Sequence, residues 1–345
     1  MTTRTVEPPS ATALAAEPSP GPVRRVLRAI GGQNLSLLAG LLLVMTVFGV
    51  LDPAYLSGDN LAVIGQTVTI AGLLAVVQTV VIICGALDIS VGSQAGLASV
   101  VSAMAFTATG GSAAAGVAVA VATGVLAGLV NGVIIVYGRV NAVIATLATL
   151  AAFKGLAQLV SGGRAQGYVM GDDLFIFLAR GSVAGLPVQV WILAVVAGAV
   201  HVLLRYTDIG RNIHAIGGND TAARLAGIDI NKYLVAVYAL AGLVAALAGI
   251  LLTARTGSGQ PVSGSEGLEL QAITAAALGG CALKGGKGAV GGTLLAVVLL
   301  GALGNGLTVV GVNTFWQNIA QGTLLVAAVV VQQRRNSTRS VGLPT

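Results

Sequence analysis

Charged residues are scarce in this sequence, and their scarcity excludes most soluble folds. Asp, Glu, Lys and Arg make up 9% of the 345 residues, whereas a soluble domain has roughly 25%. The few charges are also bunched, because none occurs between Gln33 and Leu51, between Leu61 and Leu87, or between Ile89 and Gly138. A helix that crosses the hydrocarbon core needs about 20 mostly apolar residues. The sequence therefore predicts a protein that spans a membrane many times.

Several kinds of functional site are also missing. The two cysteines, Cys84 and Cys281, lack the C-x-x-C spacing of a metal site and give no disulfide framework. The two histidines, His201 and His214, have no catalytic residues near them in sequence. The stretch 279–288 contains glycine and lysine but lacks the G-x-x-x-x-G-K-[ST] order of a phosphate-binding loop. We expect a tight turn there, because glycine accepts positive φ, and we expect no enzymatic activity, metal or cofactor.

Glycine, by contrast, is abundant. It supplies 49 residues, about twice the average share of roughly 7%. Small residues let helices approach closely where lipid gives them no hydrophobic reason to associate. The series Gly124-x-x-x-Gly128-x-x-x-Gly132 is therefore expected to be a packing ridge. The net charge of +6 is interpreted as attraction to the bilayer surface and not as nucleic-acid binding.

Hydropathy predicts an all-α, polytopic membrane protein with about ten transmembrane helices. Residues 1–30 are expected to form a disordered cytoplasmic tail, because their first 22 residues hold five of the nine prolines and no sustained apolar run. The expected spans are about 33–51, 61–86, 91–109, 113–136, 141–160, 188–204, 233–253, 268–280, 289–310 and 315–332.

The basic residues orient these spans. With both termini in the cytoplasm, all 18 basic residues except Lys154, Arg164, Arg180 and Arg255 fall inside, as the positive-inside rule requires. The acidic pairs Asp52/Asp59, Asp172/Asp173 and Glu266/Glu269 then all fall outside.

The inner loop at about 205–232 is the most polar internal stretch, and it contains a short helical pattern. Asn219 or Asp220 can cap a helix, and Gly227 suits its end. An apolar stripe follows i, i+3, i+4 spacing at Ala222, Leu225 and Ala226. Such a helix either docks into a groove of a soluble partner or is an ordinary surface helix.

Three segments carry a family resemblance. The run Thr207–Ile228 fits the pattern T-x-x-G-R-x-x-x-A-x-G-G-N-x-x-A-A-x-x-x-G-I at every fixed position. Leu87–Ser93 fits L-D-[LI]-S-V-G, and Leu278–Gly288 fits L-G-G-x-x-x-x-G-G-x-G, whereas Asn141 and Ala142 replace a common Pro-Phe. The chain resembles the permeases of ATP-binding-cassette (ABC) importers of the ribose/xylose/arabinose type.

This resemblance implies a permease domain at 31–333, a cytoplasmic tail at 334–345, and a location in the plasma membrane. It implies three partners besides the lipid bilayer: a cytoplasmic ABC ATPase, an extracytoplasmic sugar-binding protein, and a second permease copy. The ATPase would contact the coupling helix at Asn219, Asp220, Thr221, Ala222, Ala223, Arg224, Leu225, Ala226 and Gly227. The binding protein would dock near Asp172 and Asp173, and the solute would be a simple sugar or another small solute such as an amino acid.

A path for a hydroxylated solute needs polar side chains within the spans. The candidates are Gln66, Gln78, Asn131, Thr146, Gln271, Thr274 and Asn305, although each also suits a hydrogen bond between helices. Asp88 follows a long uncharged run and is expected to face protein and to cap the next helix. An ATP-independent secondary transporter or channel, with Asp88 as a proton relay, is the alternative.

The sequence also hints at an internal repeat. Leu129-Val130-Asn131-Gly132 resembles Leu303-Gly304-Asn305-Gly306, and the expected topology runs these two spans in opposite directions. Inverted repeats of this kind are common in transporters.

Overall fold

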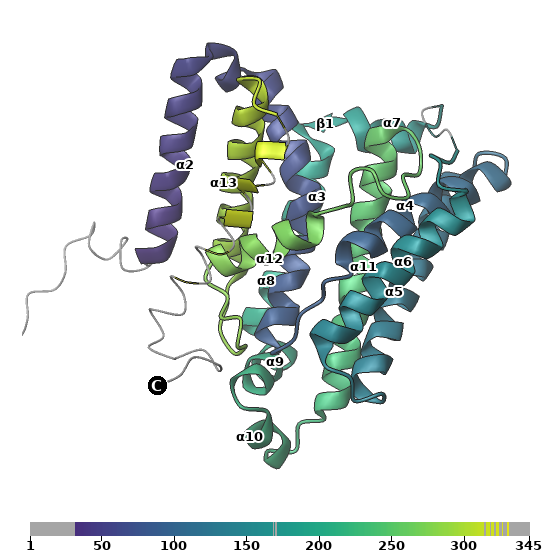
Figure 1. Ribbon diagram of the computed structural model, residues 1–345, viewed down its shortest axis with the longest axis vertical. Coiled ribbons are helices and arrows are strands. Elements are labelled where there is room, and N and C mark those ends of the chain that lie inside the picture. The colour runs from purple at the N-terminus through teal and green to yellow at the C-terminus, as the bar shows by residue number, and fades with distance from the viewer. Residues whose placement is uncertain are drawn as a thin grey trace, which may run out of the picture.

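The computed structural model describes residues 32–167, 169, 171–313 and, beyond them, 315–317, 319–320, 322–323, 326 and 330. The expected tails, 1–30 and 334–345, lie outside the described residues, as does much of the tenth expected span. Every long element in the described part is an α-helix (Figure 1). Eight of these helices are long and apolar enough to cross a membrane. The expectation of an all-α polytopic membrane protein is confirmed.

The helices follow the expected spans closely, with additions in the two long loops. In chain order the elements are α2 (Gly32–Leu51), η1 (Pro53–Leu56), α3 (Gly58–Ile83), α4 (Val91–Ala108), α5 (Ala113–Val136), α6 (Ala142–Ser161), α7 (Asp173–Arg180), β1 (Ser182–Val183), β2 (Leu186–Pro187), α8 (Val188–Tyr206), α9 (Asp208–Gly218), α10 (Asp220–Leu225), α11 (Ile230–Thr256), α12 (Leu268–Leu278) and α13 (Val290–Val309). The strands β1 and β2 form a two-residue antiparallel hairpin.

Polar side chains begin many of these helices. The hydroxyls of Ser57 and Ser112 and the side-chain oxygen of Asn141 accept hydrogen bonds from the first free backbone amides of α3, α5 and α6. Asp229 does the same for α11, and the hydrogen bond and ion pair from Lys232 hold the pKa of the Asp229 carboxyl below its usual value. Caps of this kind replace hydrogen bonds that a helix cannot make within itself.

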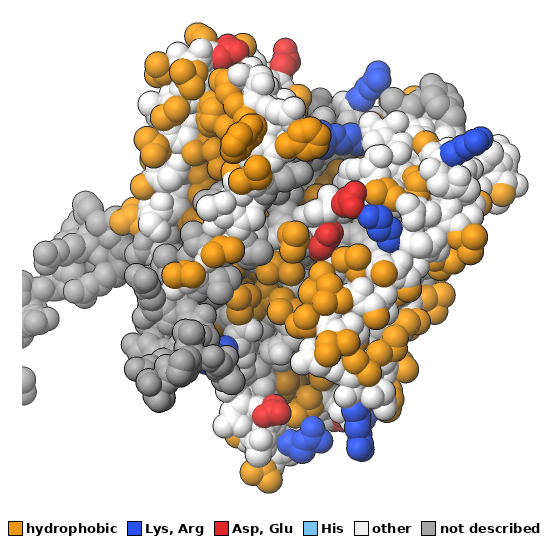
Figure 2. All heavy atoms as spheres, viewed as in Figure 1, with side chains coloured by type: hydrophobic (Ala, Val, Ile, Leu, Met, Phe, Trp, Pro, Cys, Tyr) orange, Lys and Arg blue, Asp and Glu red, His pale blue; other side chains and the backbone are white. Residues whose placement is uncertain are grey.

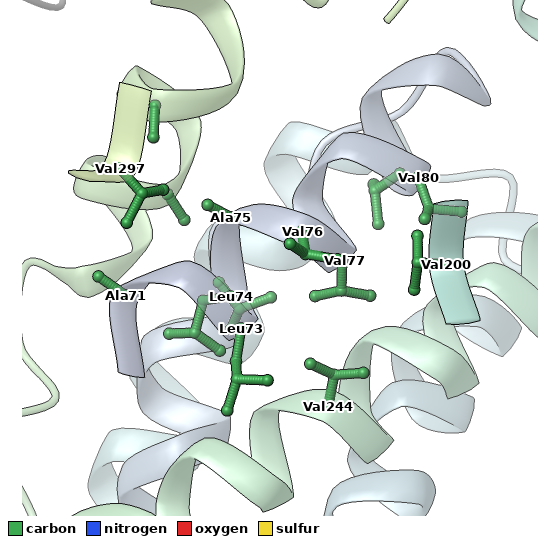
Figure 3. Packing of buried hydrophobic residues seen from close by; sticks show 14 of the residues in the cluster. Ala71, Leu73, Leu74, Ala75, Val76, Val77, Val80, Val200, Val244 and Val297 are labelled. Atoms are coloured by element: carbon green, nitrogen blue, oxygen red, sulfur yellow. The ribbon is translucent and has the colours of Figure 1, made fainter. Parts of the chain in front are cut away.

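Helix α3 forms the centre of the bundle. Its apolar side chains, including Leu73, Leu74 and Val77, are fully buried, and they meet Val200 of α8, Val244 of α11 and Val297 of α13 (Figure 3). A helix that is apolar all round is expected in such a position. Any displacement of α3 therefore changes its contacts with α8, α11 and α13.

The glycine ridge of α5 packs against α11, as expected. A Cβ atom on Gly124 or Gly128 would overlap the carbonyl oxygens of Gly242 or Tyr238 on α11. A Cβ on Gly132 would lie 2.9 Å from the Cα of Val235. The two backbones can lie this close only because no side chain separates them.

Two helices begin inside the bundle. Before α4, residues 84–90 run back from the end of α3, and before α12, residues 257–267 run along α4. The Gln260 amide donates to the Ser99 hydroxyl at 3.1 Å, and Gly92 at the start of α4 touches Glu269 at the start of α12. Irregular backbone at membrane depth occurs where protein buries it or where it lines a water-filled cavity.

The order of elements occurs twice, which supports the inverted-repeat hypothesis. In each half a long helix (α3 or α11) is followed by an irregular segment, a helix that begins inside the bundle (α4 or α12), and a helix carrying an Asn-Gly pair (α5 or α13). In Figure 1, α3 descends toward α9 whereas α11 rises from α10.

Candidate functional site

Helices α9 and α10 project from one end of the bundle (Figure 1). This end is called the α10 end, and the opposite end, which carries α7, is called the α7 end. The sequence pattern predicted one short helix in this loop, but the structure has two. Thr207 caps α9 through a 3.1 Å hydrogen bond from the Gly210 amide, and α9 packs its buried Ile213 and Ile216 against α3 and α8.

Both ends of α10 match the sequence prediction. Asn219 caps it by accepting the Ala222 amide at 2.9 Å. At the other end Gly227 has φ +84°, the Gly227 amide donates to Arg224, and the Ile228 amide donates to Ala223. These paired bonds form a Schellman motif, which ends a helix at glycine.

The surface of α10 is almost entirely free within the chain. Ala223 is the one residue of the predicted coupling segment 219–227 that is buried, at 4% exposure. The predicted apolar stripe of Ala222, Leu225 and Ala226 is exposed, and Leu225 at 85% is among the most exposed large apolar side chains of the described residues. An exposed apolar side chain at the tip of a projecting helix is typical of a docking surface.

A junction of glycines joins this projection to the bundle. A Cβ on Gly217, at the end of α9, would overlap the carbonyl oxygen of Ile83. A Cβ on Gly285 would lie 2.8 Å from the Cα of Gly85 and 2.7 Å from the carbonyl oxygen of Gly217. Gly85 and Gly285 have positive φ, so the expected turn at 279–288 is present, and it is packed between α9 and the end of α3.

Basic residues surround α10. Arg139 follows α5 with φ +54°, and with Arg224 of α10 it lines a cavity of about 380 Å³ together with Val136, Tyr137 and Asn231. The nearby ion pair of Asp229 and Lys232 is 3.1 Å long. The α10 end therefore offers guanidinium groups to a partner that carries carboxylates or phosphates.

Asp172 and Asp173 lie at the α7 end, in the long loop where the sequence placed them. The Asp172 carboxylate caps α7 by accepting the amides of Leu174 and Phe175 at 2.9 and 3.1 Å, whereas Asp173 is exposed. Phe175 is fully buried against Phe106, with ring centroids 5.5 Å apart. Hydropathy did not predict α7 as a span, because its eight residues are too few to cross a membrane.

The candidate path residues do not form one continuous line. Gln78 and Asn131 meet in one buried cluster, whereas Asn305 pairs with Asn60 at 2.9 Å. Thr146 and Thr274 are buried and donate to carbonyls of their own helices. Gln66 and Gln271 are half-buried. A role for these residues in the path stays a prediction.

The buried cluster is centred on Asp88, which faces protein as expected. Its carboxylate accepts the Ser90 amide at 2.9 Å, the Ser90 hydroxyl at 2.6 Å and the Gln94 side chain at 3.1 Å. Asn131 donates to the same Ser90 hydroxyl at 2.8 Å. Ser90, and not Asp88, is the cap residue of α4. Asp88 thus holds the irregular 84–90 segment in place.

A second charged cluster lies where the sequence did not predict one. Lys154 Nζ, within α6, lies 2.8 Å from Glu266 Oε1, and Glu269 is in the first turn of α12. The alternation of the expected spans had assigned Glu266 and Glu269 to the outer aqueous side, but Glu266 pairs with a residue well inside a membrane-length helix. A lone lysine in an apolar span was the signal available in the sequence.

Among the residues that the structure describes, no three His, Cys, Asp or Glu side chains gather as metal ligands would. The membrane-length helices, the two helices that begin inside the bundle and the projecting α9–α10 segment together define a multi-pass membrane transport protein.

Comparisons with known proteins identify the family. Residues 60–329 match the family described as branched-chain amino acid transport system / permease component, and the chain belongs to it. The chain is 39% identical to the ribose import permease protein RbsC of Escherichia coli (strain K12) over 305 residues, which cover 88% of this chain and 94% of that protein. It is 35% identical to RbsC of Bacillus subtilis (strain 168) over 316 residues, covering 88% and 94%.

A third relative is the L-arabinose ABC transporter permease protein AraH of Azospirillum brasilense. It is 36% identical over 330 residues, which cover 94% of this chain and 96% of the relative. No solved structure matches the chain significantly. The resemblance to simple-sugar ABC import permeases is confirmed, and the chain is a permease subunit of an ABC importer.

Proposed function

We propose that this permease imports a simple sugar, with ribose as the first candidate, across the plasma membrane. Two separate proteins would serve it, a cytoplasmic ATPase at the α10 end and an extracytoplasmic sugar-binding protein at the α7 end. The names of the relatives, ribose and L-arabinose permeases, support a sugar over an amino acid. A homodimer is proposed on the same grounds.

Orientation follows from charge. The α10 end carries Arg139, Arg211, Arg224 and Lys232, which belong in the cytoplasm by the positive-inside rule. Both termini and the tails at 1–30 and 334–345 are then cytoplasmic, on either side of a permease domain at 31–333. Asp172 and Asp173 lie on the opposite, outer side, where the binding protein would dock.

One observation supports the ATP-driven proposal above all others: α10 is exposed at its tip and fixed at its base. Leu225 is free to enter a partner, while Gly217, directly before α10, is packed against the end of α3. A push on α10 would therefore reach α3, the central helix of the bundle. A channel or secondary transporter has no need of such a projection.

Uptake into liposomes tests this proposal. The chain is reconstituted with its ATPase and binding protein, and labelled ribose is measured inside the vesicles. We expect accumulation only when both partners and ATP are present. Accumulation by the chain alone, driven by an ion gradient or by the solute gradient, would establish the alternative of an ATP-independent transporter or channel.

A further inference from the structure

The charged cluster of Lys154, Glu266 and Glu269 lies at membrane depth. Lys154 is about 18 Å from the first residue of α6 and about 10 Å from its last, by the helical rise of 1.5 Å per residue. Its ammonium group contacts Glu266 at 2.8 Å. The 257–267 segment that carries Glu266 therefore reaches well below the outer end of α6.

This cluster is open on one side. The side chains of Lys154 and Glu266 are 36% and 66% exposed. Figure 2 shows acidic and basic side chains together in the middle of this face, with apolar side chains above and below them. Charges exposed to hydrocarbon cost several kcal/mol each. This face is therefore turned toward water within the membrane and not toward lipid.

The cluster also borders a cavity. Its volume is about 50 Å³, which leaves room for water or for the hydroxyl groups at one edge of a solute. The lining residues are Ser93, Leu150, Lys154, Pro261, Val262, Ser265, Glu266 and Glu269. Apolar and charged groups thus meet in one small recess.

Two helix starts converge on Glu269. Its carboxylate accepts the Gly267 amide at 3.2 Å at the start of α12. It also touches Gly92 in the first turn of α4, where any Cβ would overlap it. These two contacts fix the position of the Glu269 carboxyl group, whose oxygens can accept hydrogen bonds from a solute.

We propose that Lys154, Glu266 and Glu269, with Ser93, bind the solute in the translocation path. The solute class is a neutral polyhydroxyl compound. An ammonium group and two carboxylates side by side supply donors and acceptors for neighbouring hydroxyls, and their excess of negative charge repels anions. This inference rests on the proposed function and adds to it a solute-binding site within the membrane.

Substitutions in the reconstituted complex test the binding role. Lys154→Met and Glu269→Gln are each expected to raise the ribose concentration for half-maximal uptake, or to lower uptake, at least tenfold. Lys154→Arg should stay within about threefold of the unchanged protein, because it keeps the charge. The control is Asp59→Asn, which removes an exposed carboxylate in the first turn of α3 and should leave uptake unchanged.

The double variant Lys154→Met/Glu266→Gln separates binding from a purely structural ion pair. If the pair only holds the 257–267 segment, replacing both partners is close to neutral, and uptake would return to the level of the unchanged protein. That recovery would overturn the proposal. We expect uptake to remain at least tenfold low.

Thiol labelling tests the location without relying on transport. Glu266→Cys should react with a membrane-impermeant, positively charged methanethiosulfonate reagent, and saturating ribose with the binding protein should slow the reaction at least fivefold. Val195→Cys on α8, where the native side chain is 69% exposed, should not react. An inert Glu266→Cys, or protection by amino acids in place of ribose, would overturn the proposal. If the unchanged complex shows no ATP-driven uptake, the proposed function fails, while the labelling still reports whether water reaches this face.

Discussion

The amide nitrogen of Gly286 donates a 2.9 Å hydrogen bond to the carbonyl oxygen of Ile83, and this bond ties the 281–288 segment to the end of α3. Gly217 of α9 packs against the same carbonyl group. Three segments that are distant in sequence therefore meet at one peptide group, directly before the exposed helix α10. This contact is the physical connection by which a partner at α10 can act on the centre of the bundle.

Gly217→Ala tests that connection. The new Cβ would overlap the Ile83 carbonyl, so α9 must move away from α3. We expect ATP-driven uptake to fall at least tenfold while the protein still inserts into the membrane. Gly218→Ala is the matched control, because nothing lies within 4 Å of its Cβ position. Equal uptake by the two variants would show that the junction transmits nothing.

Ala223→Leu tests how α10 is seated. Ala223 is the buried residue of α10, and added side-chain volume in a packed site typically costs 1–3 kcal/mol. We expect ATP hydrolysis to continue with uptake reduced at least fivefold, because α10 is displaced from the bundle. Ala199→Leu, at an exposed position of α8, is the control and should transport normally. Coupled uptake in Ala223→Leu would contradict this account of the helix.

The spans were predictable because hydropathy depends on composition alone. The expected span 113–136 coincides with α5, and the end of α10 at Gly227 followed from local turn chemistry. The irregular segments 84–90 and 257–267 were not predicted, because their depth is set by contacts with α4 and α3. Glu266 was placed in an outer loop, because no sequence pattern pairs it with Lys154, which lies 112 residues away.

The candidate site was also only partly predictable from the sequence. The coupling helix followed from a local motif, and its exposure in the structure fits that hypothesis. The polar path residues were chosen one by one, and the structure groups only Gln78 and Asn131, around Asp88. Which polar groups meet depends on helix rotation, and a single sequence does not specify it.

Gly128→Val tests the packing of α5 on α11. A side chain at Gly128 would overlap the Tyr238 backbone and push α5 away from α11. This separation would also break the close contacts that Gly124 and Gly132 make with α11. We expect the melting temperature of the purified protein in detergent to fall by several degrees. Gly198→Ala on α8 meets nothing within 4 Å and should be neutral or stabilising by up to about 1 kcal/mol. Equal melting temperatures would show that the ridge is not a packing surface.

Asp88→Ala and Asp88→Asn separate a structural role from proton transfer. The alanine variant leaves the Ser90 amide and the Ser90 hydroxyl without their acceptor, at roughly 1–3 kcal/mol for each buried group. The asparagine variant keeps one oxygen for Ser90, so its loss of stability should be several times smaller and its ATP-driven uptake retained. A stable Asp88→Asn protein that no longer transports would favour the proton-relay alternative.

Disulfide cross-linking at Leu225 tests the central claim most directly. The native cysteines, Cys84 and Cys281, are buried, so Leu225→Cys supplies an exposed thiol at the tip of α10. Cysteines are placed in turn along the candidate groove of the ATPase, and the complex is oxidised in inside-out vesicles. The account predicts a permease–ATPase adduct and a block of ATP-driven uptake that reduction reverses. A Leu225→Cys thiol that reacts only from the outer side of the membrane, or that forms no adduct at any ATPase position, would contradict it.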